Sequence, residues 1–138
     1  MKHILFDTNI LLDIALDRDP FVEDAAKVLQ LMDMQVITGY ITANSITDIY
    51  YIIKKAKGHS EGIAFIIDLL DLVMVIGVDE SVIKGALKTG MKDFEDAIQA
   101  FCAKQANLDM IITRNETDFA RSGLLVLDAY NAYRYLIN

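Results

Sequence analysis

The sequence predicts an α/β protein, a three-layer α/β/α sandwich in which helices cover both faces of a central, mainly parallel sheet. Short apolar or β-branched segments alternate along the chain with longer segments of helical periodicity, and this alternation is typical of parallel sheets with crossover helices. A hydrophobic share of 54% and a single proline argue against disorder. The chain has 138 residues and no repeat or linker, so we expect one domain spanning residues 1–138.

Five segments have the length and composition of strands. The first follows the N-terminal methionine directly, and the next three each follow a longer helical pattern. All five are short and rich in apolar or β-branched residues, as strands usually are. The predicted strands are Lys2–Phe6, Gln35–Tyr40, Leu72–Gly77, Asp109–Thr113 and Leu124–Leu127.

Seven segments have helical periodicity, and local signals mark several of their ends. Pro20 suits the first turn of a helix, and Gly58 separates two helices. Asp79 or Ser81 can cap the helix that follows. The predicted helices are Asn9–Leu16, Pro20–Met32, Ala43–Lys57, Ser60–Leu70, Glu80–Thr89, Phe94–Ala106 and Ala129–Leu136.

The chain shows no signal for export or membrane insertion. Asp7 follows only three apolar residues, too few for the core of a signal peptide, and Asp68 and Asp71 interrupt the most apolar stretch, Ile63–Ile76. Cys102 is the only cysteine and lies in a helical pattern, where we expect a buried and inert thiol. We therefore expect a cytoplasmic protein in a reducing compartment, with no membrane role.

The formal net charge of -7 opposes nucleic-acid binding at first sight, because such proteins usually carry a basic surface. Two groups of basic residues nevertheless stand close together in the sequence: Lys54, Lys55, Lys57 and His59, and Lys84, Lys88 and Lys92. The second group repeats every four residues and would share one face of a helix. Both groups can be ordinary solvated helix surface, and contact with phosphates is the alternative.

Acidic and amide side chains stand where apolar strands end. Asp7 follows the first predicted strand, and Asn115 and Asp118 follow the fourth. Ligands of open α/β sheets bind beyond the carboxyl ends of the strands, and both strands are candidates for the sheet centre, so these side chains should meet in one crevice. Asp93 and Asp96 are three residues apart at the start of a helix and would add a second pair.

A further acid, Asp48, lies at the border of the apolar face that Ile49 and Ile53 mark, so it can point into the same cleft or lie on the surface. Isolated carboxylates among apolar residues are costly unless they are paired or bind a metal. The pattern as a whole therefore favours a divalent-metal site.

Taken singly, each of these residues also has a structural explanation. Asp7 and Asn9 are residue types that often cap helices. Asp93 and Glu95 can complement the dipole of the helix that begins there. Asp118 can cap the short turn into Phe119. Only the combination points to chemistry.

Three segments together resemble the signature segments of the PIN domain family. They are Ile4–Asn9, Asp93–Ala100 and Ile111–Phe119, and their order and spacing agree with the family over essentially the whole chain. The resemblance implies an α/β/α sandwich with a central parallel sheet. It also implies a metal-dependent ribonuclease, because many members have this activity, including the toxin of VapC-type toxin–antitoxin pairs. RNA is then the expected substrate, and an antitoxin protein is a candidate partner.

The resemblance also implies roles for individual acids. Asp7 becomes the first metal ligand and Asp96 the second, while Asp48 stands where the family commonly has glutamate or aspartate. The fourth acidic position is open, because Asn115 takes the place where several members carry aspartate. Asp118 is the nearby carboxylate that can substitute, and the expected catalytic and metal-binding set is therefore Asp7, Asp48, Asp96 and Asp118.

Neighbouring residues are expected to support this site. Asp93 is a candidate outer acid, and Thr8, Asn9 and Thr113 are candidate hydrogen-bonding supports. Arg114, or a lysine from either basic group, is expected to neutralise the scissile phosphate.

Hard carboxylate oxygens suit Mg²⁺ or Mn²⁺, which can activate water and relieve charge on a phosphodiester. Only His3 and His59 are present and neither has zinc-like spacing, so zinc is disfavoured.

Two rival functions come from other classes. A receiver-like signalling module would need an acidic pair after the first strand and a lysine after the last, whereas Asp7 is alone and Leu127 leads to Asp128. A catalytically silent PIN-like module for RNA or protein binding remains an alternative, because the fourth acidic position is ambiguous. Cleavage of single-stranded RNA with added metal separates the three.

Residues 43–72 hold more apolar side chains than two amphipathic helices need for one buried stripe each. They are Tyr50, Tyr51, Ile52, Ile53, Ile63, Phe65, Ile66, Ile67, Leu69 and Leu70. Exposed apolar patches usually mark interfaces, and the toxins that the chain resembles commonly pair through their early helices, so we expect a two-fold homodimer here. The lysines of residues 54–57 would then flank the interface. The alternative is a monomer whose terminal helix, with Tyr130, Tyr133 and Leu136, covers the patch.

Overall fold

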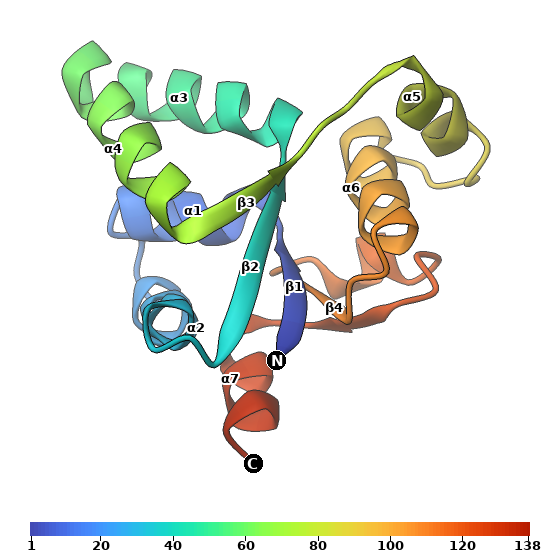
Figure 1. Ribbon diagram of the computed structural model, residues 1–138. Coiled ribbons are helices and arrows are strands. Elements are labelled where there is room, and N and C mark those ends of the chain that lie inside the picture. The colour runs from blue at the N-terminus through green and yellow to red at the C-terminus, as the bar shows by residue number, and fades with distance from the viewer.

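The computed structural model describes residues 1–138 and has a central sheet of five parallel strands in the order β3-β2-β1-β4-β5 (Figure 1). The predicted α/β/α fold is confirmed. The strands are β1 (Lys2–Phe6), β2 (Ile37–Thr42), β3 (Val73–Ile76), β4 (Met110–Ile112) and β5 (Leu125–Leu127). β1 occupies the centre and pairs with β2 on one side and β4 on the other.

Seven helices cover the two faces of the sheet, with α1, α2, α3, α4 and α7 on one face and α5 and α6 on the other (Figure 1). They are α1 (Thr8–Ala15), α2 (Val22–Asp33), α3 (Ala43–Lys57), α4 (His59–Leu72), α5 (Glu80–Leu87), α6 (Phe94–Gln105) and α7 (Ala129–Ile137). A short 3₁₀-helix, η1 (Glu116–Phe119), follows β4. None of these helices combines the length and apolar character that a bilayer crossing requires.

The central strand β1 is apolar because both of its faces are buried. Ile4 and Phe6 point into the larger core, which they share with α1, α2 and α3. Leu5 points into the second core and meets Ala100 and Ala103 of α6. Strands buried on both faces read as continuous apolar runs. The core therefore holds the carboxyl ends of β1 and β4 rigidly beside each other.

The main boundary error concerns β2, which was predicted two residues too early. Gln35 adopts a left-handed φ of 59°, and the Val36 N–H donates to the carbonyl of Leu31. These residues therefore complete the turn after α2 and cannot join the sheet. At the other end, Ile41 and Thr42 pair with β3.

Three smaller features also bear on the predictions. Pro20 precedes its helix, because α2 begins at Val22. α5 ends at Leu87, so Lys88 and Lys92 lie beyond it and, contrary to expectation, do not share one helix face with Lys84. Asp79 does cap α5, accepting a hydrogen bond from the Val82 N–H at 3.0 Å.

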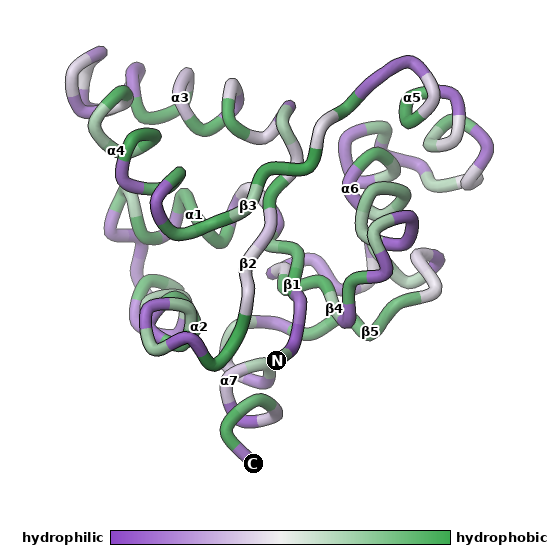
Figure 2. Tube along the Cα trace, viewed as in Figure 1, coloured by the Kyte–Doolittle hydropathy of each residue, from purple (hydrophilic) through white to green (hydrophobic).

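The α3–α4 hairpin stays open on its outer side. Gly58, with φ of 96°, joins the two helices, which pack against each other. The terminal helix α7 packs on α2 and lies at the opposite end of the molecule from the hairpin, so it does not cover it (Figure 1). Tyr51 and Ile67 are 62% and 59% exposed. Figure 2 shows hydrophobic stretches along both helices of the hairpin.

Candidate metal centre

Asp7 lies at the carboxyl end of β1, where α1 begins. Its side chain makes no capping hydrogen bond. Instead, Oδ1 accepts from Gln99 Nε2 at 3.1 Å and Oδ2 accepts from Thr113 Oγ1 at 2.7 Å. Only 5% of Asp7 is exposed. The carboxylate is thus held in one orientation by β4 and α6, and the positive end of the α1 dipole favours its charge.

Thr113 connects this aspartate to the loop after β4. It is fully buried, donates to Asp7 and accepts a hydrogen bond from the Asn115 N–H at 3.0 Å. The same loop continues into η1, which carries Asp118. Asp118 does not cap this turn; its own N–H donates to the Asn115 carbonyl.

The start of α6 brings a second set of acids. Asp93 caps the helix, and its Oδ1 accepts from the Asp96 N–H at 2.9 Å. Burial, followed by the charges of Asp93, Asp7 and Asp118, raises the pKa of Asp96 to about 7. No cation opposes this shift, so the negative charge of Asp96 is not compensated by its surroundings. Asp96 is therefore poised to accept a proton or a cation.

Asp48 reaches the same place from α3. Ser45 ties the start of α3 to α1 through a hydrogen bond with Thr8 at 2.9 Å, and to the end of β2 through one with Thr42 at 3.0 Å. Hydrogen bonding to Asp48 is the main cause that raises the pKa of Glu95 to about 7, and burial and the neighbouring acids add to it. Glu95 therefore lies close to Asp48 in the cavity.

These side chains surround one cavity of about 420 Å³. Eight of the residues predicted from the sequence line it: Asp7, Thr8, Asn9, Asp48, Asp93, Asp96, Asn115 and Asp118. None of the four ion pairs in the structure involves an acid of this cavity. The cavity therefore concentrates negative charge at the carboxyl edge of the central strands.

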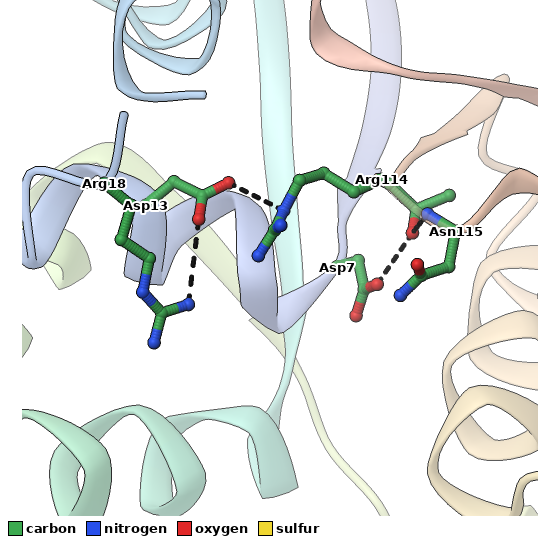
Figure 3. Close-up of polar contacts among 6 residues, drawn as sticks. Asp7, Asp13, Arg18, Arg114 and Asn115 are labelled. Atoms are coloured by element: carbon green, nitrogen blue, oxygen red, sulfur yellow. Dashed lines mark hydrogen bonds and ion pairs between the residues drawn. The ribbon is translucent and has the colours of Figure 1, made fainter. Parts of the chain in front are cut away.

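Arg114 does not belong to this cavity, contrary to the expectation that it would face the scissile phosphate. Its Nε lies 3.0 Å from Oδ2 of the fully buried Asp13, and its guanidinium lies 4.1 Å from the centre of the Phe21 ring. Figure 3 shows the Arg114 side chain extending toward Asp13, while Asn115 lies beside Asp7. Thr113 and Arg114, which are consecutive in the chain, thus contact two different acids, Asp7 and Asp13.

Glu95 and Gln99 are the carboxyl and amide residues of the cavity that were missed as site residues. Glu95 was expected only to complement the helix dipole, yet it lines the cavity with Asp48. Gln99 is 2% exposed and holds Asp7. The spacing contained a signal, because Gln99 is three residues after Asp96 and so lies on the same face of α6.

The donor set suits a hard divalent cation. All of the charged groups that line the cavity are carboxylates, and the buried Oε1 of Gln99 has no hydrogen-bond partner. No three acidic, histidine or cysteine side chains of the structure are grouped closely enough to hold an ion by themselves. Mg²⁺ does not require such a cage, because it usually keeps several waters and uses one or two carboxylates. The residues therefore fit a partly hydrated Mg²⁺ or Mn²⁺.

The chain belongs to the PIN domain family, whose model matches residues 3–117. No curated protein matches the chain in sequence. Among solved structures, a chain of the DNA-bound VapBC of Salmonella typhimurium has a TM-score of 0.71 at 14% identity, covering 94% of this chain and 99% of that one.

Two further solved structures are similar. A chain of a toxin–antitoxin complex from Klebsiella pneumoniae has a TM-score of 0.67 at 25% identity, covering 92% of this chain and 98% of that one. VapC20 of Mycobacterium tuberculosis, described as a toxin that cleaves the sarcin–ricin loop, has a TM-score of 0.69 at 15% identity, covering 88% of this chain and 96% of its own. At such identities the likeness to VapC20 and to the Salmonella protein is a likeness of fold.

Proposed function

We propose that the protein is a Mg²⁺- or Mn²⁺-dependent endoribonuclease, the VapC-type toxin of a toxin–antitoxin pair. The observation that carries the proposal is the cavity at the carboxyl ends of β1 and β4, which gathers carboxylates without an internal cation. Membership of the PIN family and the toxin–antitoxin complexes among its structural relatives support this activity and an antitoxin partner.

Asp7 and Asp96 are the proposed metal ligands, with Asp48 and Asp118 completing the acidic set. Gln99 and Thr113 orient Asp7 through the hydrogen bonds described above, as outer groups commonly do for metal-binding carboxylates. The acids of α6 and α3 repel one another, and this repulsion contributes to the raised pKa values of Asp96 and Glu95. Protons and a divalent cation are alternative ways to relieve it, so they compete for the site.

Hydrolysis of a phosphodiester needs a water that attacks phosphorus and a proton for the departing oxygen. A divalent cation, when bound, would lower the pKa of water and neutralise charge on the phosphoryl oxygens. Asp7 would keep its orientation throughout, because two donors fix it. Glu95, whose pKa is raised to about 7, can exchange a proton with the water or the departing oxygen.

The decisive experiment is cleavage of fluorescent single-stranded RNA of mixed sequence with Mg²⁺ or Mn²⁺. We expect cleavage that EDTA abolishes and that added metal restores. Asp7→Asn should lower the rate by at least ~100-fold, more than the loss of an outer group costs. The matched control is Asp33→Asn, an exposed acid at the end of α2 that should cleave like the wild type. Full activity in Asp7→Asn would refute the site.

We also propose that two copies pair through the α3–α4 hairpin, residues 43–72. Its exposed apolar side chains, such as Tyr51, Ile67 and Leu70, have no cover within the chain. Light scattering should report twice the chain mass of 15.5 kDa, and Ile67→Glu should return it to the monomer value. A wild-type monomer at high micromolar concentration would rule this dimer out.

A further inference from the structure

The acidic cavity continues into two neighbouring cavities along the outer side of α6. It shares Asp93, Asp96 and Asp118 with a second cavity of about 670 Å³. That cavity shares Met91 and Arg121 with a third one of about 490 Å³. Because each cavity shares lining residues with the next, the three form one groove that leads away from the acids.

The charge along this groove changes sign with distance from the acids. Lys92 and Arg121 line the second cavity, and Lys104 joins Arg121 in the third. None of these three side chains takes part in an ion pair. Arg121 makes only a long hydrogen bond of 3.5 Å to the carbonyl of Gly90. These three cations, which no acid of the chain pairs with, give the far end of the groove a positive charge in a chain whose net charge is -7.

The far cavity also offers an apolar wall. Met91, Ala100 and Phe101 line it, together with polar side chains such as Gln105 and Ser122. The Phe101 ring is held against α5, because it occupies the space that a Cβ on Gly85 would need. A volume of about 490 Å³ lies within the range of about 300–1,000 Å³ that is usual for small-ligand sites. An aromatic wall beside cations is the arrangement that single-stranded nucleic acids use, because bases stack and phosphates pair with cations.

We propose that this groove, formed by Lys92, Lys104, Arg121, Met91 and Phe101, binds the RNA strand on one side of the scissile bond. Arg121 and the two lysines contact phosphates, and the third cavity receives a base against Phe101. The proposal rests on the ribonuclease function proposed above and adds where the substrate lies. An acidic centre repels a polyanion, so cations next to it are needed to hold the strand in place.

The lysines at the end of α3, within residues 54–57, are less suited to binding this RNA strand. Lys54 lies over the ring of Tyr50, and Lys57 donates to the carbonyl of Ala15 at 2.9 Å. Both stand in the last turn of α3, where cations complement the helix dipole. Neither lines the acidic cavity or the two that continue it.

The test is RNA binding measured apart from cleavage. All binding variants carry Asp96→Asn so that the RNA stays intact. Binding of fluorescein-labelled single-stranded RNA of mixed sequence is measured by fluorescence anisotropy, in EDTA and at several salt concentrations. Adding Arg121→Gln or Lys104→Gln should raise Kd about fivefold or more and reduce the slope of log K against log salt by about 0.7 for each phosphate that is no longer neutralised. Phe101→Leu should raise Kd without changing the slope, because it removes base stacking and keeps the charge.

The matched control is Lys27→Gln, which removes an exposed lysine of α2 that pairs with Glu23. If the wild type cleaves RNA but Arg121→Gln and Lys104→Gln bind like Lys27→Gln, the groove is overturned and the nuclease stands. If the wild type does not cleave but binding depends on Arg121 and Lys104, the groove holds and the nuclease proposal fails. Absence of any RNA binding overturns the groove as well.

Discussion

Asp13 and Asp96 are two acids whose pKa burial raises, and the charges beside them have opposite signs. Asp13, near the end of α1, is fully buried and lies 3.0 Å from Arg114 and 3.7 Å from Arg18. Burial raises the pKa of Asp13, while both guanidinium groups oppose that shift. Asp96 has no cation partner and instead faces Asp93, Asp7 and Asp118, whose charges add to the effect of burial in raising its pKa.

The presence or absence of a cation partner separates an acid that stabilises the fold, Asp13, from acids that can bind a ligand, such as Asp96. Two guanidinium groups within the chain offset part of the cost of burying the Asp13 carboxylate. The charges around Asp96 are balanced by nothing in the chain, so folding leaves an electrostatic cost there that a proton or a cation can relieve. Figure 3 shows Arg114 directed to Asp13 on α1 and away from Asp7, which precedes the same helix.

Removal of Asp13 should have the largest effect on stability. Asp13→Asn leaves two guanidinium groups without their buried partner, and breaking such a pair typically costs about 3–5 kcal/mol. The arginine side chains are 27% and 34% exposed and can turn to water, so we expect a cost at the lower end, about 3 kcal/mol. Urea unfolding of Asp13→Asn and of the control Asp33→Asn measures the difference. A loss below about 1 kcal/mol would mean that Asp13 does not stabilise the fold through these arginines.

A divalent metal should raise the stability of the protein through Asp96 and not through Asp13. Mg²⁺ or Mn²⁺ at about 100 times its Kd should stabilise the wild type by about 2.7 kcal/mol, because the native state binds it preferentially. Asp96→Asn should lose this gain, and in EDTA it should be as stable as the wild type or more so, because like charges are removed. Thermal unfolding with and without metal gives both values. A metal-induced rise in Tm that survives in Asp96→Asn would contradict the ligand assignment.

The sequence could predict features that depend on local patterns, but not contacts between residues that are distant in the chain. The apolar run of β1 and the helix 43–57 are local signals, and both matched the structure. Asp7, Asn115 and Asp118 could be brought together because parallel strands end at one edge of the sheet. The partner of Arg114 could not be predicted, because Asp13 is distant in the sequence and nothing local links the two. Glu95 was missed because its role depends on Asp48, which approaches from another helix.

A smaller effect is expected from pH in the metal-free protein. The pKa values of Asp96 and Glu95 rise to about 7 on folding from ordinary values of 3.8 and 4.5. Between about pH 4 and 7 the folded state therefore binds more protons than the unfolded state, so stability falls as pH rises and levels off above about 7. Thermal unfolding in EDTA across this range should show the decline. The double variant Glu95→Gln/Asp96→Asn should flatten it, and an unchanged slope would show that other groups cause it.

The smallest effect concerns the fourth acidic position, for which Asn115 and Asp118 compete. Both line the cavity and both are exposed, but only Asp118 carries a charge, and that charge contributes to the raised pKa of Asp96. Asp118→Asn should therefore lower the pKa of Asp96 and weaken Mn²⁺ binding about threefold to tenfold, at or below the usual cost of losing an outer acid. Asn115→Asp in that background should restore binding if the two positions are equivalent around the ion. Isothermal titration with Mn²⁺ decides this, since unchanged affinity in Asp118→Asn would leave Asp7 and Asp96 as sufficient ligands and remove Asp118 from the site.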